Sequence, residues 1–251
     1  MNVEFVDQYA KLEEYARVRT GELSQMLQPY IDVTDRYGQL ICGVVSALGK
    51  TPPASPSEAA LRDLMADVFD FLYETRPLII KGKLEVAYPL ARRAYESLSL
   101  MVACEADANL AKRWQAGKQI GNAEVRTVLD KHPRGEDEAS LKQTYKFFSL
   151  ATHPNREMIA GRRLGEGNQF VLGSIGHPSL ALLADYAMKT LSLWFWFTAF
   201  CAYSYRDLMS KLEPTFGTDY METARQAREV HTWLAEQYRR MLAEEQANAS
   251  P

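Results

Sequence analysis

Residues 190–205 read TLSLWFWFTAFCAYSY, an uncharged run bracketed by Lys189 and Arg206. If this run is helical, apolar side chains surround it on all sides and leave no face for water. The run is shorter than the roughly 18 to 20 apolar residues that span a bilayer, and its Ser and Thr hydroxyls make it more polar. It therefore predicts the centre of a helical bundle, or half of a dimer interface, within a helix from Ser179 to Lys211.

Stretches with helical periodicity lie on both sides of this run. Most of the 14 glycines and 11 prolines lie between these stretches, as in helices joined by loops. The other predicted helices cover about residues 3–28, 30–48, 58–75, 78–105, 107–117, 122–131, 138–152 and 219–247. Pro89 is expected to kink or divide its helix, because proline lacks a backbone donor. No stretch is typical of a parallel-sheet strand, so the predicted fold is all-α, a single bundle of about eight helices.

The clearest linker is GKTPPASP at residues 49–56. It separates an N-terminal helical pair (residues 1–48) from a main bundle (residues 57–247), and the two are expected to form one compact unit. Ser57 is the predicted N-cap of the following helix, with Glu58 in its first turn.

Composition narrows the class of protein. The chain of 251 residues is 47% hydrophobic and 24% charged, with a net charge of −3. These values are ordinary for a globular protein, and they argue against a disordered chain and against a nucleic-acid binder that uses its whole surface. The 3 cysteines are too few for a disulfide scaffold and indicate reduced thiols. We expect a cytoplasmic protein.

Residues 156–178 interrupt the helical pattern with five glycines around the apolar segment QFVL. They predict a long glycine-rich loop with a possible short hairpin, and loops of this length are often functional. Arg156, Arg162 and Arg163 lie together in it and could contact RNA or an anionic ligand. The alternative is a solvated loop without a partner.

Several kinds of site have no motif in this sequence. His and Cys are scattered, and Cys-x-x-Cys, Glu-x-x-His and His-Glu-x-x-His do not occur, so no metal is predicted. Phosphate-binding glycine motifs and the Gly-x-Ser-x-Gly elbow are also missing, and no cofactor is predicted.

Polar residues with helical spacing edge two of the predicted apolar helices. Arg92 and Glu96 are four residues apart, as are successive members of Tyr145, Ser149 and His153. If the helices pack together, these side chains could bind a phosphate or carboxylate, or support acid–base chemistry through His153. The alternative is a satisfied interior network in which Arg92 pairs with Glu96 and His153 caps its helix.

A resemblance rests on segments that include these residues: RRAYE at 92–96, WQAG at 114–117, VR at 125–126 and YKFFSLATHP at 145–154. This order resembles a bacterial family of helical proteins known as a domain of unknown function. In that family an Arg-x-x-x-Glu helix is followed by a Tyr-x-x-x-Ser-x-x-x-His-Pro helix end. The resemblance covers about residues 60–205 and implies an all-helical fold, but no activity.

A looser resemblance is to HEPN-type ribonucleases, in which an Arg and a His separated by four to six residues cleave RNA without metal across a dimer. Arg126 to His132 and Arg225 to His231 match this signature, whereas about one match is expected by chance. His132 precedes a proline at a helix end, so Arg225 and His231 are the catalytic candidates. The alternative is a partly buried His231 on the apolar face of its helix.

Three functions follow as expectations. The leading one is a helical interaction or regulatory protein with an unknown protein partner and no catalysis of its own. The alternatives are a HEPN-like ribonuclease and a sensor of a small anion. A homodimer is also expected, because the 194–200 segment and a C-terminal stripe offer more apolar surface than one bundle needs. That stripe consists of Leu234, Tyr238, Met241 and Leu242.

Overall fold

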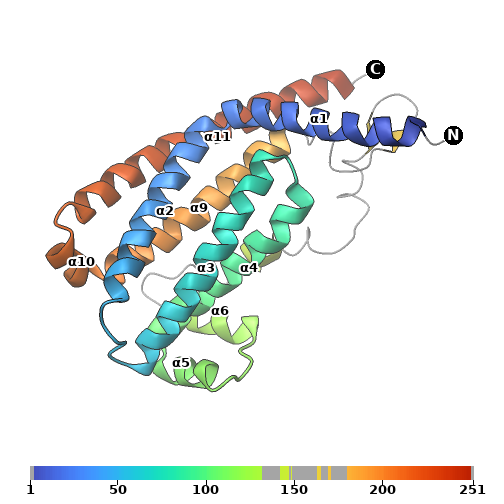
Figure 1. Ribbon diagram of the computed structural model, residues 1–251. Coiled ribbons are helices and arrows are strands. Elements are labelled where there is room, and N and C mark those ends of the chain that lie inside the picture. The colour runs from blue at the N-terminus through green and yellow to red at the C-terminus, as the bar shows by residue number, and fades with distance from the viewer. Residues whose placement is uncertain are drawn as a thin grey trace.

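The computed structural model describes residues 3–131, 142–146, 148, 163–164, 169–170 and 180–249, and its fold is all-α (Figure 1). The described helices with defined bounds are α1 (Val3–Met26), α2 (Gln28–Leu48), α3 (Pro56–Ile80), α4 (Leu84–Ala106), α5 (Ala108–Gln115), α6 (Asn122–Asp130), α9 (Leu180–Ser204), α10 (Arg206–Leu212) and α11 (Phe216–Ala249). Residues 142–146 are also helical. The predicted fold class is confirmed, and the number of helices roughly matches the expected eight.

Helix α9 is the centre of the bundle, as the uncharged run predicted. It contacts α2, α3, α4, α10 and α11. Trp194 and Phe197 are fully enclosed, and only Phe195 among its large aromatic residues near the middle is exposed, at 41%. Within the described chain, no helix is long and apolar enough to cross a membrane.

Helices α3 and α4 form an antiparallel hairpin, seen in the middle of Figure 1. The sequence pattern wrongly ended the first helix near residue 75 and placed the break of the second at Pro89. In the structure α3 continues through Pro77, and α4 contains Pro89. The chain turns instead at Gly82, whose φ of 68° is in the left-handed region that glycine enters without steric cost.

The start of α3 also differs from the expectation. Ser55 is the N-cap, not Ser57, and its hydroxyl accepts a hydrogen bond from the Glu58 backbone N–H at 3.1 Å. Pro56 occupies the first helical position, where proline lacks only a donor that no helix bond would use. Arg62 fastens the preceding linker, because its guanidinium donates to the carbonyls of Leu48 (2.9 Å) and Thr51 (2.5 Å).

The predicted helix over residues 179–211 is two helices. Tyr205 separates α9 from α10 with φ −114° and ψ 20°. The backbone bonds on either side persist, from Tyr205 N–H to Cys201 O (3.0 Å) and from Met209 N–H to Tyr205 O (2.9 Å). Because only the backbone of Tyr205 departs from helical geometry, the hydrophobic periodicity of the sequence does not reveal the break.

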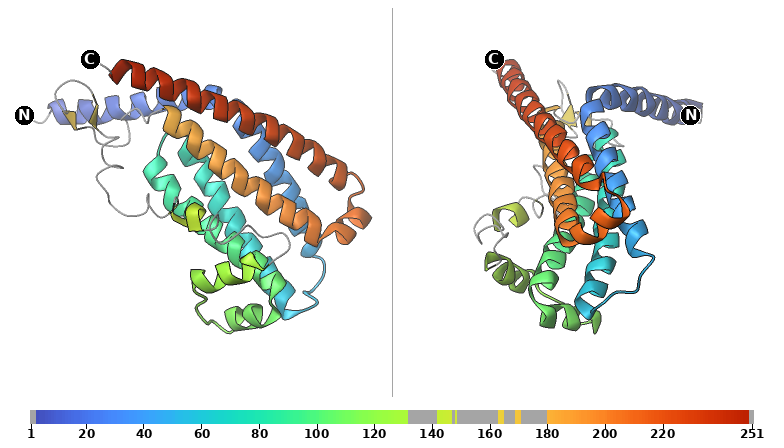
Figure 2. Two further views of the ribbon diagram at one scale, coloured as in Figure 1. Left: turned by 180° about the vertical axis from the view of Figure 1, so that it is seen from behind. Right: turned by 90° about the vertical axis from the view of Figure 1, so that its left-hand side faces the viewer.

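The predicted apolar stripe of the C-terminal helix is largely internal, which corrects the expectation that it is exposed. Leu234 is fully buried and Met241 is 8% exposed, while Tyr238 packs against the core. Helix α11 lies along α9 and α2, and these neighbours cover the stripe (Figure 2). The prediction of a homodimer therefore loses this surface, and in the 194–200 segment that also motivated it Trp194, Phe197 and Phe200 are buried.

The N-terminal helices join the same core. Leu23 of α1 and Leu27, between α1 and α2, belong to the hydrophobic cluster that includes α9. On α2, the buried Tyr30 hydroxyl bonds the Thr190 hydroxyl of α9 at 3.0 Å. The two ends of the chain leave the bundle in different directions, as the right-hand view of Figure 2 shows.

Part of the predicted glycine-rich loop is described. Two short strands, β1 (Arg163–Leu164) and β2 (Gln169–Phe170), pair antiparallel, with Arg163 opposite Phe170. This is the position of the short hairpin that the sequence suggested.

Candidate functional site

The first part of the site is the ion pair on α4. Arg92 Nε donates to Glu96 Oε1 at 2.9 Å, and each side chain is 22% exposed. The spacing of four residues places both on one helix face, as expected from the sequence. The pair lies at the edge of the bundle, where α6 packs against α4.

Tyr145 comes to this pair from the helical segment 142–146. Arg92 Nη2 donates to the Tyr145 hydroxyl at 2.8 Å, and the Arg92 guanidinium lies 5.1 Å from the centre of the tyrosine ring. Phe148, three residues after Tyr145, is buried and stacks on Tyr95 of α4 with ring centres 5.5 Å apart. This aromatic contact anchors the segment and explains why Tyr145 reaches Arg92.

Two residues of α6 complete the site, and sequence reasoning did not assign them to it. The Arg126 guanidinium lies 5.5 Å from the centre of the same Tyr145 ring. Asn122 Nδ2 donates to Glu96 Oε1 at 3.2 Å. Both face α4 because they lie one helical turn apart on α6, whose Val125 and Leu129 are buried. We call Arg92, Glu96, Asn122, Arg126 and Tyr145 the arginine–tyrosine cluster.

The cluster carries an excess of positive charge. It contains two guanidiniums and one carboxylate, so its net charge is +1 if all three are ionised. Arg126 Nε is buried and has no hydrogen-bond partner within the described part of the chain. The neighbouring pair of Arg113 and Glu124 is already neutral, and the Arg113 hydrogen bond lowers the pKa of Glu124. The arrangement suits an anion that accepts charge-assisted hydrogen bonds from arginine.

Three of the five predicted ligand-binding residues therefore lie together: Arg92, Glu96 and Tyr145. Ser149 and His153 lie outside the described residues, as does His132. For RNA binding, Arg156 and Arg162 also lie outside them. Of Arg163 the structure describes only the backbone, in β1.

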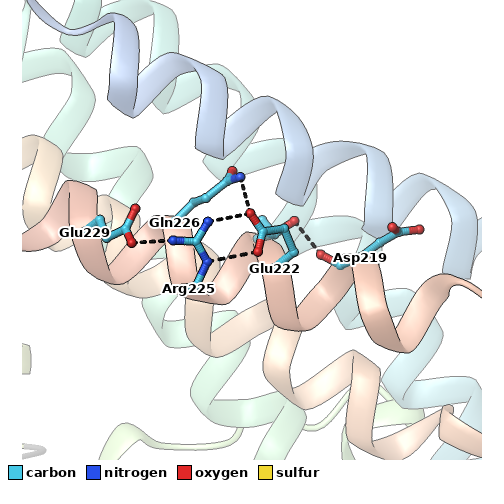
Figure 3. Close-up of polar contacts among 6 residues, drawn as sticks. Asp219, Glu222, Arg225, Gln226 and Glu229 are labelled. Atoms are coloured by element: carbon cyan, nitrogen blue, oxygen red, sulfur yellow. Dashed lines mark hydrogen bonds and ion pairs between the residues drawn. The ribbon is translucent and has the colours of Figure 1, made fainter.

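Arg225 and His231 do not form a common site in this chain. Figure 3 shows the Arg225 guanidinium held along α11 between Glu222 and Glu229, with bonds of 2.7 Å and 2.5 Å. His231 is exposed, contrary to the expectation that it lies on the apolar face. It lines a small cavity of about 190 Å³ with Leu191 and Phe195 of α9. Six residues of α-helix separate the two side chains by roughly a third of a turn, so they point in different directions.

Metal-ligating side chains do not gather in the described parts of the chain: no three His, Cys, Asp or Glu residues lie close enough to hold an ion. Comparison with known proteins adds nothing further, because no protein-family model, no curated protein and no solved structure matches the chain. The resemblance described above remains a prediction, and the function has to be argued from the geometry.

Proposed function

We propose that the protein is a helical regulatory protein without catalysis of its own, which binds a small carboxylate- or phosphate-bearing molecule at the arginine–tyrosine cluster. The observation that carries the proposal is Arg126, whose buried Nε has no partner among the described residues while its guanidinium faces Tyr145. A buried donor without an acceptor costs about 1 to 3 kcal/mol, and more when it is charged. A bound anion would remove that cost.

A purely structural network would look different. Glu96 already accepts from Arg92 and Asn122, and so it is committed to the first arginine. No described acidic side chain pairs with Arg126, whose side chain is half-buried and whose Nε is buried. This second guanidinium therefore favours ligand binding over a closed interior network.

The position of the cluster favours a regulatory role. Its residues come from α4, α6 and the segment 142–146, so a bound anion would connect three separate parts of the chain. A ligand that binds one arrangement of these parts more tightly shifts the population toward it. A cytoplasmic location, an unknown protein partner and a homodimer belong to this proposal. The ribonuclease alternative gains no comparable support, because Arg225 is bound by two carboxylates of its own helix.

The test is calorimetry and thermal unfolding with phosphate and acetate, against chloride at constant ionic strength. We expect one of the two oxyanions to raise Tm, since a ligand at about 100 times its Kd stabilises the folded state by about 2.7 kcal/mol. Arg126→Gln should abolish this rise. Glu96→Gln should strengthen binding, because it removes the one carboxylate of the cluster while keeping an acceptor for Arg92.

The matched control is Arg113→Gln, which removes a neighbouring arginine that is already paired with Glu124. This variant should respond to the anion as the unmodified protein does. Equal shifts in phosphate, acetate and chloride, or a full response in Arg126→Gln, would refute the proposal.

A further inference from the structure

A second cavity lies at the C-terminal end of α9, and its lining includes none of the residues of the arginine–tyrosine cluster. The chain turns at Tyr205 and again between Glu213 and Phe216, so the end of α9, α10 and the start of α11 come together. Between them is a half-open cavity of about 710 Å³, which α4 closes on one side through Val102. We call it the aromatic groove.

The walls of the aromatic groove are apolar. Trp196, Phe200 and Tyr220 line it, and Tyr203 and Met221 lie at its surface, 62% and 66% exposed. Large apolar side chains that gather around a concave surface are typical of a binding site, whereas single exposed ones are ordinary. Methionine, with three rotatable side-chain bonds, also adapts to ligands of varied shape.

One charge accompanies this apolar lining. Arg206, the first residue of α10, is the only charged residue among the described residues that line the groove. No ion pair or hydrogen bond of its guanidinium occurs within the described part of the chain, and its backbone carbonyl accepts from the Ser210 hydroxyl at 2.8 Å. The groove therefore combines an apolar body with one available cation at its edge.

We propose that the aromatic groove binds an amphiphilic carboxylate, with the apolar chain against Trp196 and Phe200 and the carboxylate on Arg206. The volume lies in the range of about 300 to 1,000 Å³ that is typical of small-molecule sites. The single arginine sets the sign of the head group, and the aromatic walls set the apolar character of the rest. A half-enclosed cavity formed by four helices fits such a molecule better than a flat protein surface would.

Decanoate is the probe, compared by calorimetry with decanol and decyltrimethylammonium, all below the concentrations at which they form micelles. These three share one chain length and differ in head-group charge. We expect decanoate to bind about tenfold or more tightly than decanol, in line with a charge-assisted hydrogen bond, and the cation to bind weakest. Arg206→Gln should remove the preference for decanoate and leave decanol binding unchanged. Arg239→Gln, an exposed arginine farther along α11, is the matched control.

Two further variants test the apolar walls. Ala199→Leu fills the groove from α9 and should weaken decanoate and decanol alike. If it fails to fold, Met221→Ser serves instead, because a side chain that is 66% exposed contributes little to the core. Both variants should keep the response to phosphate or acetate at the arginine–tyrosine cluster, so the two proposals can fail separately.

Three results would overturn the assignment. They are equal affinity for the three head groups, a preference for decanoate that survives Arg206→Gln, and affinities that stay unchanged in Ala199→Leu and Met221→Ser. Light scattering distinguishes another occupant. If the protein is a dimer that Ala199→Leu or Met221→Ser converts to a monomer, a second copy of the chain fills the groove.

Discussion

At the scale of single residues, neighbouring side chains on the surface of α11 lower the pKa of the Glu222 carboxyl. The pKa of Glu222 is lowered to about 2, first by the Arg225 hydrogen bond and then by that of Gln226. The pKa of Arg225 is raised correspondingly by Glu222 and Glu229. Arg225 is thus bound to two carboxylates of its own helix.

This pKa gives a prediction of pH dependence for Glu222→Gln. A carboxyl whose folded pKa lies below its unfolded value, about 4.3, stabilises the fold at higher pH. That contribution is lost progressively as pH falls from about 4.5 through the folded pKa of about 2, because the carboxyl then becomes protonated in the folded state as well. The difference in unfolding free energy between the unmodified protein and Glu222→Gln should therefore shrink over this interval. Urea unfolding at each pH measures it.

The control is Glu236→Gln, an exposed glutamate on the same helix. It carries the same substitution on the same helix, so a change common to both variants does not come from the Arg225 ion pair. A Glu222→Gln difference that stays constant between pH 5 and 2.5 would show that the ion pair does not form in solution. Because the pair is exposed, added salt should also reduce the difference.

The sequence predicted the candidate site only for residues that lie close together on one helix. The spacing of Arg92 and Glu96 sufficed to place both on one face of α4. Arg126 was visible in two sequence patterns, but its contact with Tyr145 depends on how α6 and residues 142–146 pack on α4. Helical periodicity describes one helix at a time and contains no information on which helices become neighbours.

At the scale of elements, helix existence was predictable and several helix ends were not. Pro77 and Pro89 lie inside helices although proline usually ends them. Each lacks one backbone bond, and the packing of α3 against α4 compensates for that loss. Gly82 was the better signal for the turn, since its backbone conformation suits few other residues.

The N-cap of α3 gives a prediction for Ser55→Ala. The Ser55 hydroxyl accepts from the Glu58 N–H, and the Glu58 carboxylate in turn accepts from the Ala54 N–H at 2.6 Å. Removing the hydroxyl leaves a helical donor without its partner and should cost about 1 kcal/mol of stability. Denaturant unfolding measures this cost. Ser57→Ala is the matched control and should change stability by less than about 0.5 kcal/mol; equal losses in both variants would contradict the assignment of Ser55 as the cap.

At the scale of the whole molecule, the uncharged run at residues 190–205 identified the centre of the bundle before any packing was known. A helix that is apolar all round has to be enclosed by others, and α9 is enclosed by five. The C-terminal stripe was harder to interpret, because an apolar face can cover the same chain's core or a second chain's surface. Because Leu234 is buried, the apolar stripe covers the core of its own chain.

The short connection between α3 and α4 has a consequence for the order in which the molecule assembles. Only Lys81, Gly82 and Lys83 separate the two helices, whereas the Tyr30–Thr190 bond joins residues 160 positions apart. Closing a short loop loses less chain entropy, so the α3–α4 hairpin should form early in folding.

Kinetics test this order through two fully buried leucines. Leu98→Ala in α4 should slow refolding, and Leu234→Ala in α11 should mainly accelerate unfolding, with each losing about 2 to 5 kcal/mol of stability. Stopped-flow measurements across a denaturant series separate the two rates. If Leu234→Ala slowed refolding as much as Leu98→Ala did, the rate-limiting step would already include α11, and the bundle would close from its ends rather than grow from its central hairpin.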